Sequence, residues 1–352
     1  MVTEKKIYNG IDLFKLIAAC LVVLLHTIET TAWYPYEIKY VCTSFAVPFF
    51  FMASGYFFYF GLSKAENRKM YLINYIKHIV LLFIIWAIII FGPFTVLSYL
   101  NIYAGESVIT ILAVLFRRFF VIGPGAYWYL LALMWSSLFL YFCFVKNNTN
   151  LLYVGIILGL IFEVCYSSLQ GVLSQFTLFR IFFKVIYFVF SWKNNFLMYG
   201  IPFMGIGYLI AQNNLSISTQ KSKAIFVIST VGAIIEYNLP IIFPSAFWND
   251  NRLEFCFILQ AIAIFMLAKD SNYQISSEKS KSIRQLSAFI YFLHVPLLNH
   301  FLNPLLKHYI GAYTYSSVMI APKLLILLGF SFMCFLLIKK VNNKYLNILI
   351  NG

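Results

Sequence analysis

Three ionisable residues lie in the first apolar stretch of the chain, where charge is costly. The stretch reads IDLFKLIAACLVVLLHT and holds Asp12, Lys15 and His26. Ionisable groups inside such a segment usually mark function. Histidine suits general-base catalysis because its unperturbed pKa lies near neutral pH, and lysine binds phosphate as a point charge. The residue types therefore predict anion binding at Lys15 and proton transfer at His26.

The spacing of these residues suits an elongated ligand. In a helix, the eleven steps from Lys15 to His26 place both on one stripe, about 20° apart, but separate them by roughly 16 Å along the axis. Asp12 is three residues before Lys15, which allows a local ion pair. A plainer interpretation stays open, in which Lys15 snorkels to the interface and His26 caps the outer end of the helix.

The elements that must position these residues are membrane helices. The composition is 62% hydrophobic and only 11% charged, and the apolar residues form long runs. A soluble domain carries about a quarter charged residues, and a helix needs about 20 residues to cross a bilayer. We therefore predict an all-α integral membrane protein, a single bundle of about ten transmembrane helices.

The predicted spans cover most of the sequence. They run near 9–28, 40–60, 78–100, 127–145, 151–169, 196–212, 224–243, 254–268, 285–305 and 320–338. We expect one domain over 1–352, with no separate soluble domain. Met1 to Lys6 and the apolar run after them resemble a signal peptide, but a small-residue cleavage site is missing, so we predict a retained first helix.

The net charge of +14 raises the possibility of a nucleic-acid partner. Its distribution excludes that interpretation, because Lys and Arg sit in short loops between apolar runs. One set of alternate loops, with both termini, carries 16 of them and the other carries 9, which predicts cytoplasmic termini. The outer stretch from Leu178 to Trp192 is apolar with interspersed cations, as in an interfacial helix or a buried re-entrant segment.

Cysteine usage indicates no metal site and no disulfide framework. The six cysteines are scattered singly through or beside apolar segments, without C-x-x-C spacing. Ordinary packing residues are the expected interpretation.

Five sequence blocks, in order, resemble the acyltransferase-3 family of membrane O-acyltransferases. The first block is the basic residue, ten residues and histidine formed by Lys15 and His26. The others are VPFFFMASGYFF with Ser54-Gly55-Tyr56, AYWYLLALM around Trp128, YGIPFMGIGYLI around Gly205 and Gly207, and SAFIYFLHVPLL around His294. The chain departs from the family where many members have arginine in place of Lys15, and arginines at the start of the third helix in place of Lys77 and His78.

The resemblance implies transfer of an acyl group, commonly acetyl from acetyl-coenzyme A, to a hydroxyl of a cell-surface carbohydrate or similar acceptor. The membrane would be the bacterial plasma membrane. His26 would activate the hydroxyl or carry the acyl group briefly. Lys15, with Lys77 and His78, would hold the phosphates of the cofactor. The candidates for binding the acceptor are Arg117, Arg118, Trp128 and Tyr129, although an interfacial aromatic belt with flanking arginines explains them as well.

Four further polar residues have simpler explanations. His294 is expected to be satisfied by a neighbouring helix, although it could face the same cavity as His26. Ser54 and Gly55 are small residues that allow close helix approach. Glu163 and Glu236 could line a water-filled path, or could reach the interface from near the ends of their helices.

A second function class stays open on the sequence. The membrane half of vancomycin-resistance serine racemases resembles the same family, and buried polar groups also suit a transporter of an amino acid or an exporter of a glycan intermediate. Transporters are often built from internal repeats. The two halves of this chain show no repeat, which favours the enzyme.

Overall fold

The computed structural model describes residues 8–28, 41–190, 194–242, 255–343 and 346–350, and every regular element in these ranges is a helix. The chain divides into two compact units. Unit 1 comprises Met1–Phe50, Ser216–Gly232 and Cys256–Gly352, and unit 2 comprises Phe51–Leu215 and Ala233–Phe255. The retained-helix prediction for Met1 to Lys6 concerns residues outside the described ranges.

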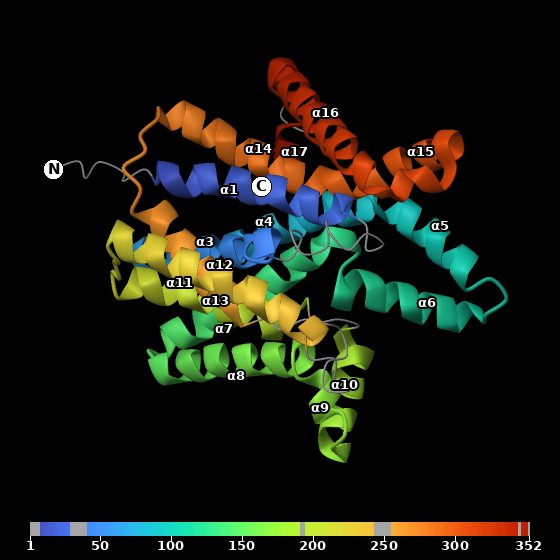
Figure 1. Cartoon of the computed structure of the whole chain (residues 1–352). Coiled ribbons are helices and arrows are strands. Elements are labelled where there is room, and N and C mark those ends of the chain that lie inside the picture. The colour runs from blue at the N-terminus through green and yellow to red at the C-terminus, as the bar shows by residue number, and fades with distance from the viewer. Residues whose placement is uncertain (1–7, 29–40, 191–193, 243–254, 344–345, 351–352) are drawn as a thin grey trace. The chain divides into compact units, whose positions relative to one another are not determined.

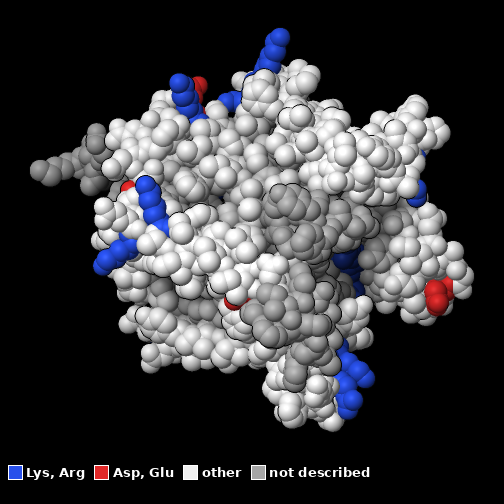
Figure 2. Space-filling model, viewed as in Figure 1, with Lys and Arg blue, Asp and Glu red and all other residues white. Residues whose placement is uncertain are grey.

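Among the described residues, seven helices are long and apolar enough to cross a membrane. They are Asn9–Thr27, Val41–Lys64, Arg68–Ile90, Gly125–Val145, Thr149–Ser167, Ser277–Tyr315 and Ser317–Val341, with two shorter apolar helices at Phe196–Gln212 and Cys256–Lys269. The remaining predicted span falls on α12 (Thr219–Ile242), whose first turn is polar. The chain is therefore an all-α, multi-pass membrane protein, as predicted. On the face drawn in Figure 2, charged side chains are few and wide uncharged areas separate them, which suits contact with lipid.

Unit 1 is built around a parallel pair of helices, α1 (Asn9–Thr27) and α14 (Ser277–Pro296), which lie side by side in Figure 1. Contacts join the start of α1 to the start of α14, and the end of α1 to the end of α14. The side chain of Ser276 caps the first turn of α14 by accepting a hydrogen bond from the Lys279 amide.

Two further helices pack on this pair. At Gly10, near the start of α1, an added Cβ would overlap the carbonyl oxygen of Ala268 at the end of α13 (Cys256–Lys269), so α1 and α13 run in opposite directions. α16 (Ile320–Val341) packs on α14 through Phe335 and Phe289.

Unit 2 contains most of α3 (Ala46–Lys64), and α7 (Trp128–Val145), α8 (Thr149–Ser167) and α11 (Ile201–Gln212). α8 runs antiparallel to α7, and Gly155 of α8 lies against Phe139 of α7. α8 also runs antiparallel to α11. Gly159 of α8 lies against Pro202 near the start of α11, and the earlier Ile156 of α8 lies against the later Gly205 of α11. These three successive spans thus alternate in direction, as crossing a membrane requires.

The third span begins ten residues earlier than predicted. α4 (Arg68–Phe83) starts after Asn67, whose side chain accepts a hydrogen bond from the Met70 amide at 2.9 Å. This cap extends the helix beyond the apolar run. The span continues beyond α4 through Ile84–Ile90 and ends there. α5 (Gly92–Ile102) begins next, because Pro93 cannot continue the preceding turn.

The two long outer stretches form helices of their own. α6 (Val108–Arg117) lies in the first, and α9 (Gln170–Leu173) and α10 (Thr177–Phe190) lie in the second. α10 covers the stretch that begins at Leu178, which was expected to be an interfacial helix or a buried re-entrant segment. Trp192, at the end of that stretch, lies outside the described residues. Apolar side chains of α10 are exposed, including Leu178, Ile181 and Phe188. Its depth in the membrane stays a prediction.

Candidate functional site

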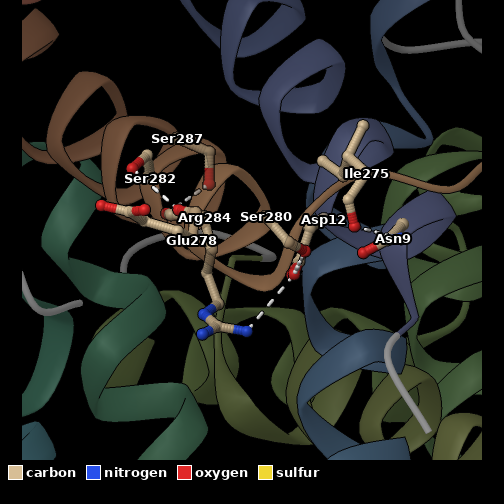
Figure 3. Close-up of polar contacts among 8 residues, drawn as sticks. All are labelled: Asn9, Asp12, Ile275, Glu278, Ser280, Ser282, Arg284 and Ser287. Carbon is tan, nitrogen blue, oxygen red and sulfur yellow. Dashed lines mark hydrogen bonds and ion pairs between the residues drawn. The ribbon is translucent and has the colours of Figure 1, made fainter.

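A buried carboxylate gathers polar groups at the start of the α1–α14 pair. Asp12 is 3% exposed. Its Oδ2 accepts hydrogen bonds from the hydroxyl of Ser280 at 2.7 Å and from Nη1 of Arg284 at 3.3 Å, and Figure 3 shows both donors directed at the same carboxylate. These donors offset the cost of burying its charge. We call Asp12, Lys15, Ser280 and Arg284 the Asp12 cluster.

Lys15 completes this cluster one helical turn after Asp12. Its ammonium group interacts electrostatically with Asp12 and with Arg284. The cation that pairs with Asp12 in the structure is Arg284 from another helix, and the local pairing of Asp12 with Lys15 stays a prediction. One carboxylate against two cations leaves a positive charge, and the Arg284 side chain is 47% exposed. The cluster can bind an anion that reaches Arg284.

Two histidines face each other at the opposite end of the same helix pair. The rings of His26 and His294 have centroids 5.1 Å apart and planes inclined at 46°. His26 lies in the last turn of α1 and is exposed. His294 is 0% exposed. His294 is hydrogen-bonded within its own helix, and its ring packs against the first helix. The sequence left open that it could face the same cavity as His26, and the structure places the two rings in contact.

The Asp12 cluster and the histidine pair lie far apart along α1. Fourteen residues separate Asp12 from His26, a rise of about 21 Å, and the eleven from Lys15 give about 16 Å. The helix between them is apolar and packs into unit 1 through Ala18, Ala19, Val22 and Val23. A ligand that uses both ends must therefore be long.

Ser54 and the predicted aromatic residues form a separate group in unit 2. The hydroxyl of Ser54 lies 3.1 Å from the phenol oxygen of Tyr129. Phe51 packs against Tyr129 and Trp128, with ring centroids 4.6 and 5.9 Å apart. A phenol is not a base that activates serine at neutral pH. This geometry gives Ser54 no base that would make it a nucleophile, and a supporting function for Ser54 stays a prediction.

The two outer arginines contact neighbouring helices of unit 2. Nη2 of Arg117 donates to the carbonyl of Tyr187 at 2.8 Å, and its guanidinium lies over the Phe188 ring. Arg118 lies over the ring of Tyr99 at 5.9 Å. Arg117 thus contacts α10, and Arg118 contacts α5. Whether they also bind an acceptor stays a prediction.

Four residues predicted near helix ends have the following surroundings. Lys77 and His78 are exposed in the second half of α4 instead of at its start, because the helix begins at Arg68. Glu163 is 0% exposed, so it does not reach the interface. Glu236 accepts a hydrogen bond from the Phe255 amide at 3.3 Å.

Metal binding has no support in the part of the chain that the structure describes. There, no group of three or more His, Cys, Asp or Glu side chains is placed to hold an ion. The six cysteines are free thiols. Their scattered positions in the sequence agree with this arrangement.

Sequence reasoning missed Arg284 and Ser280. In the sequence, Arg284 is only one of the 16 Lys and Arg residues in one set of alternate loops. A signal was nevertheless present, because Arg284 precedes His294 by ten residues, much as Lys15 precedes His26 by eleven. Both helices of the pair thus carry a cation, an apolar run and a histidine.

Comparisons with known proteins extend over most of the chain. The sequence model of the acyltransferase domain of the acyltransferase-3 family matches residues 8–340. An amino-acid racemase of Enterococcus faecalis is 24% identical over 304 residues, 81% of this chain and 40% of the racemase. A serine/alanine racemase of Enterococcus gallinarum is 26% identical over 239 residues, 65% of this chain and 32% of the racemase. The chain thus spans less than half the length of either relative. No solved structure matches it significantly.

Proposed function

This chain belongs to the acyltransferase-3 family and is a multi-pass membrane acyltransferase, and from that premise we propose its substrates. It transfers an acyl group, acetyl on the family resemblance, from an acyl-coenzyme A to a hydroxyl of a cell-surface carbohydrate or a related small acceptor. The α1–α14 pair carries this proposal. It holds a cationic cluster at one end and an exposed histidine at the other, roughly 16 Å from Lys15.

The Asp12 cluster is the proposed site for the phosphates of the donor. Arg284 offers a planar fork of N–H donors that matches phosphate geometry, and Lys15 adds a point charge. Asp12 keeps the guanidinium in place through its Oδ2. Lys77 and His78, exposed on α4, are further candidates for the phosphates.

His26 is the proposed general base for the acceptor hydroxyl. The hydroxyl proton passes to His26, and the oxygen attacks the thioester carbonyl carbon. The C–S bond breaks, and the thiolate leaves with the proton from His26, so the histidine returns to its starting state. A transient acyl group on His26 would serve the same net reaction. The exposure of His26 supports access by the acceptor.

The acceptor is proposed to bind on the outer side of the membrane, beside Arg117, Arg118, Trp128 and Tyr129. The bias of Lys and Arg between alternate loops supports cytoplasmic termini. The similarity to two Enterococcus proteins supports a bacterial plasma membrane. In that orientation the Asp12 cluster meets the donor from the cytoplasm, and His26 meets the acceptor near the outer surface.

The test is thioester turnover by purified protein with labelled acetyl-coenzyme A, comparing the wild type with His26→Ala. His308→Ala is the matched control, because His308 is also an exposed histidine. We expect saturable binding in all three proteins. Thioester loss should fall on the order of a hundredfold in His26→Ala alone.

Two results would count against parts of this proposal. Full turnover in His26→Ala would reject His26 as the base. Absence of binding at millimolar acetyl-coenzyme A, from protein that is monodisperse, would favour transport of a small polar metabolite. The names of the two racemases refer to amino acids. Serine and alanine are therefore the first ligands to test for transport.

A further inference from the structure

His294 is a buried histidine that the reaction above does not use. Its Nδ1 lies 2.6 Å from the carbonyl oxygen of Tyr291 and 3.2 Å from that of Ile290. A carbonyl oxygen can only accept, so Nδ1 carries the ring hydrogen and donates it. In the neutral imidazole the lone pair is then on Nε2. The backbone of α14 therefore selects one tautomer of His294.

Nε2 of His294 is an acceptor kept away from water. It is buried and has no hydrogen-bond partner among the described residues. A buried acceptor without a donor is unfavourable, because nothing compensates for the water it has lost. Such a group in a native structure needs an explanation, and one explanation is a donor that approaches in another state of the protein.

The neighbouring ring identifies a donor for this acceptor. His26 lies against His294 with the ring centroids 5.1 Å apart, which is close enough for a small rotation of the exposed ring to bring two nitrogens into hydrogen-bond range. Tyr291, the other ring beside His294, is 5.9 Å away. An N–H of His26 is therefore a suitable partner for Nε2.

We propose that His294 is a positioning residue for His26, an inference that rests on the proposed function. Nε2 of His294 accepts a hydrogen bond from one ring nitrogen of His26. The other nitrogen of His26 then presents its lone pair to the acceptor hydroxyl. When His26 takes the hydroxyl proton, the same hydrogen bond stabilises the resulting cation, and the proton later leaves with the thiolate. No proton has to move to His294.

Two substitutions separate this function from simple packing. In His294→Asn, the amide nitrogen replaces Nδ1 and still donates to the Tyr291 carbonyl, but no acceptor replaces Nε2. In His294→Gln, the longer side chain places an amide oxygen near the position of Nε2. If His294 positions His26, the Gln variant should retain function that the Asn variant loses. If His294 only fills space, the two should be impaired alike.

The first measurement does not depend on activity. Purified wild type, His294→Asn and His294→Gln are treated with diethyl pyrocarbonate, and modification of each histidine is followed by peptide mass spectrometry. His26 should react at least about threefold more slowly in His294→Asn than in the wild type, and at a near wild-type rate in His294→Gln. His308, which is exposed, is the internal control in each protein. Equal or faster reaction of His26 in His294→Asn would overturn the proposal.

The second measurement uses acetyl-coenzyme A turnover. His294→Asn should lower kcat on the order of a hundredfold and leave KM for acetyl-coenzyme A within about twofold, and His294→Gln should recover at least about a tenth of wild-type kcat. Equal losses in the two variants would overturn the positioning function. A wild type without turnover would instead reject the proposed enzyme, while the modification rates would still decide whether His294 controls His26.

Discussion

At the scale of single residues, Asp12 decides what the start of α1 can bind. A buried carboxylate is unfavourable unless cations and donors surround it. Ser280 and Arg284 supply hydrogen bonds, and Lys15 adds a charge from one turn away. The result is a guanidinium fixed by one carboxylate oxygen but still half exposed. Such a group is prepared to bind an anion with little loss of side-chain freedom.

Charge reversal in this cluster should weaken donor binding. Lys15→Glu and Arg284→Glu are each expected to raise Kd for acetyl-coenzyme A tenfold or more, because about 1.5–3 kcal/mol comes from a hydrogen bond to a charged group. Lys15→Arg keeps the charge and should change Kd less than about threefold. Isothermal titration with monodisperse protein measures all three.

Lys223→Glu is the matched control for net charge, since Lys223 is an exposed lysine near the start of α12. It should bind acetyl-coenzyme A as the wild type does. Equal affinities for Lys15→Arg and Lys15→Glu would exclude a phosphate contact at Lys15.

At the scale of elements, close helix packing in unit 2 depends on glycine. An added Cβ at Gly55 of α3 would overlap the carbonyl oxygen of Met204, and one at Gly207 of α11 would overlap that of Met52. Membrane helices associate largely through van der Waals packing, so small residues at such crossings allow the backbones to approach. The close approach predicted at Gly55 agrees with this geometry.

Gly207→Ala should therefore destabilise the protein. The added methyl group meets backbone that cannot rotate away, and overpacking of this kind costs about 1–3 kcal/mol. Gly329→Ala in α16 is the control, because an added Cβ there meets nothing within 4 Å. A thermal unfolding midpoint in detergent should fall by several degrees for Gly207→Ala only. A midpoint equal to that of Gly329→Ala would contradict the close approach.

At the scale of the whole molecule, helix directions and charge distribution make consistent predictions. α1 and α14 are parallel, as the first and ninth of ten spans must be, and α8 is antiparallel to its neighbours α7 and α11. An even number of spans places both termini on one side. The larger share of Lys and Arg predicts that this side is the cytoplasm.

Cysteine labelling tests this orientation. Glu106→Cys lies before α6 in a predicted outer loop, and Ser216→Cys lies in a predicted inner loop. Each is made in a chain whose six native cysteines are replaced. A membrane-impermeant maleimide should label Glu106→Cys in intact cells, and should label Ser216→Cys only after lysis. The reverse pattern would invert the orientation.

Much of this protein followed from the sequence alone. Apolar runs of bilayer length predicted the all-helical membrane fold, because lipid requires each backbone polar group to be satisfied within its own segment. Helical geometry predicted that Lys15 and His26 share one stripe at a separation of roughly 16 Å. These conclusions depend on local composition and on the period of a single helix.

The tertiary structure decided which residues meet. Arg284 and Ser280 lie 272 and 268 residues from Asp12 in the chain, and only the packing of α14 on α1 brings them to its carboxylate. The same packing brings His294 to His26 and buries it where the backbone selects its tautomer. A period within one helix says which face a residue occupies, but not which helix covers that face. The partners of Asp12 and His26 therefore had to come from the fold.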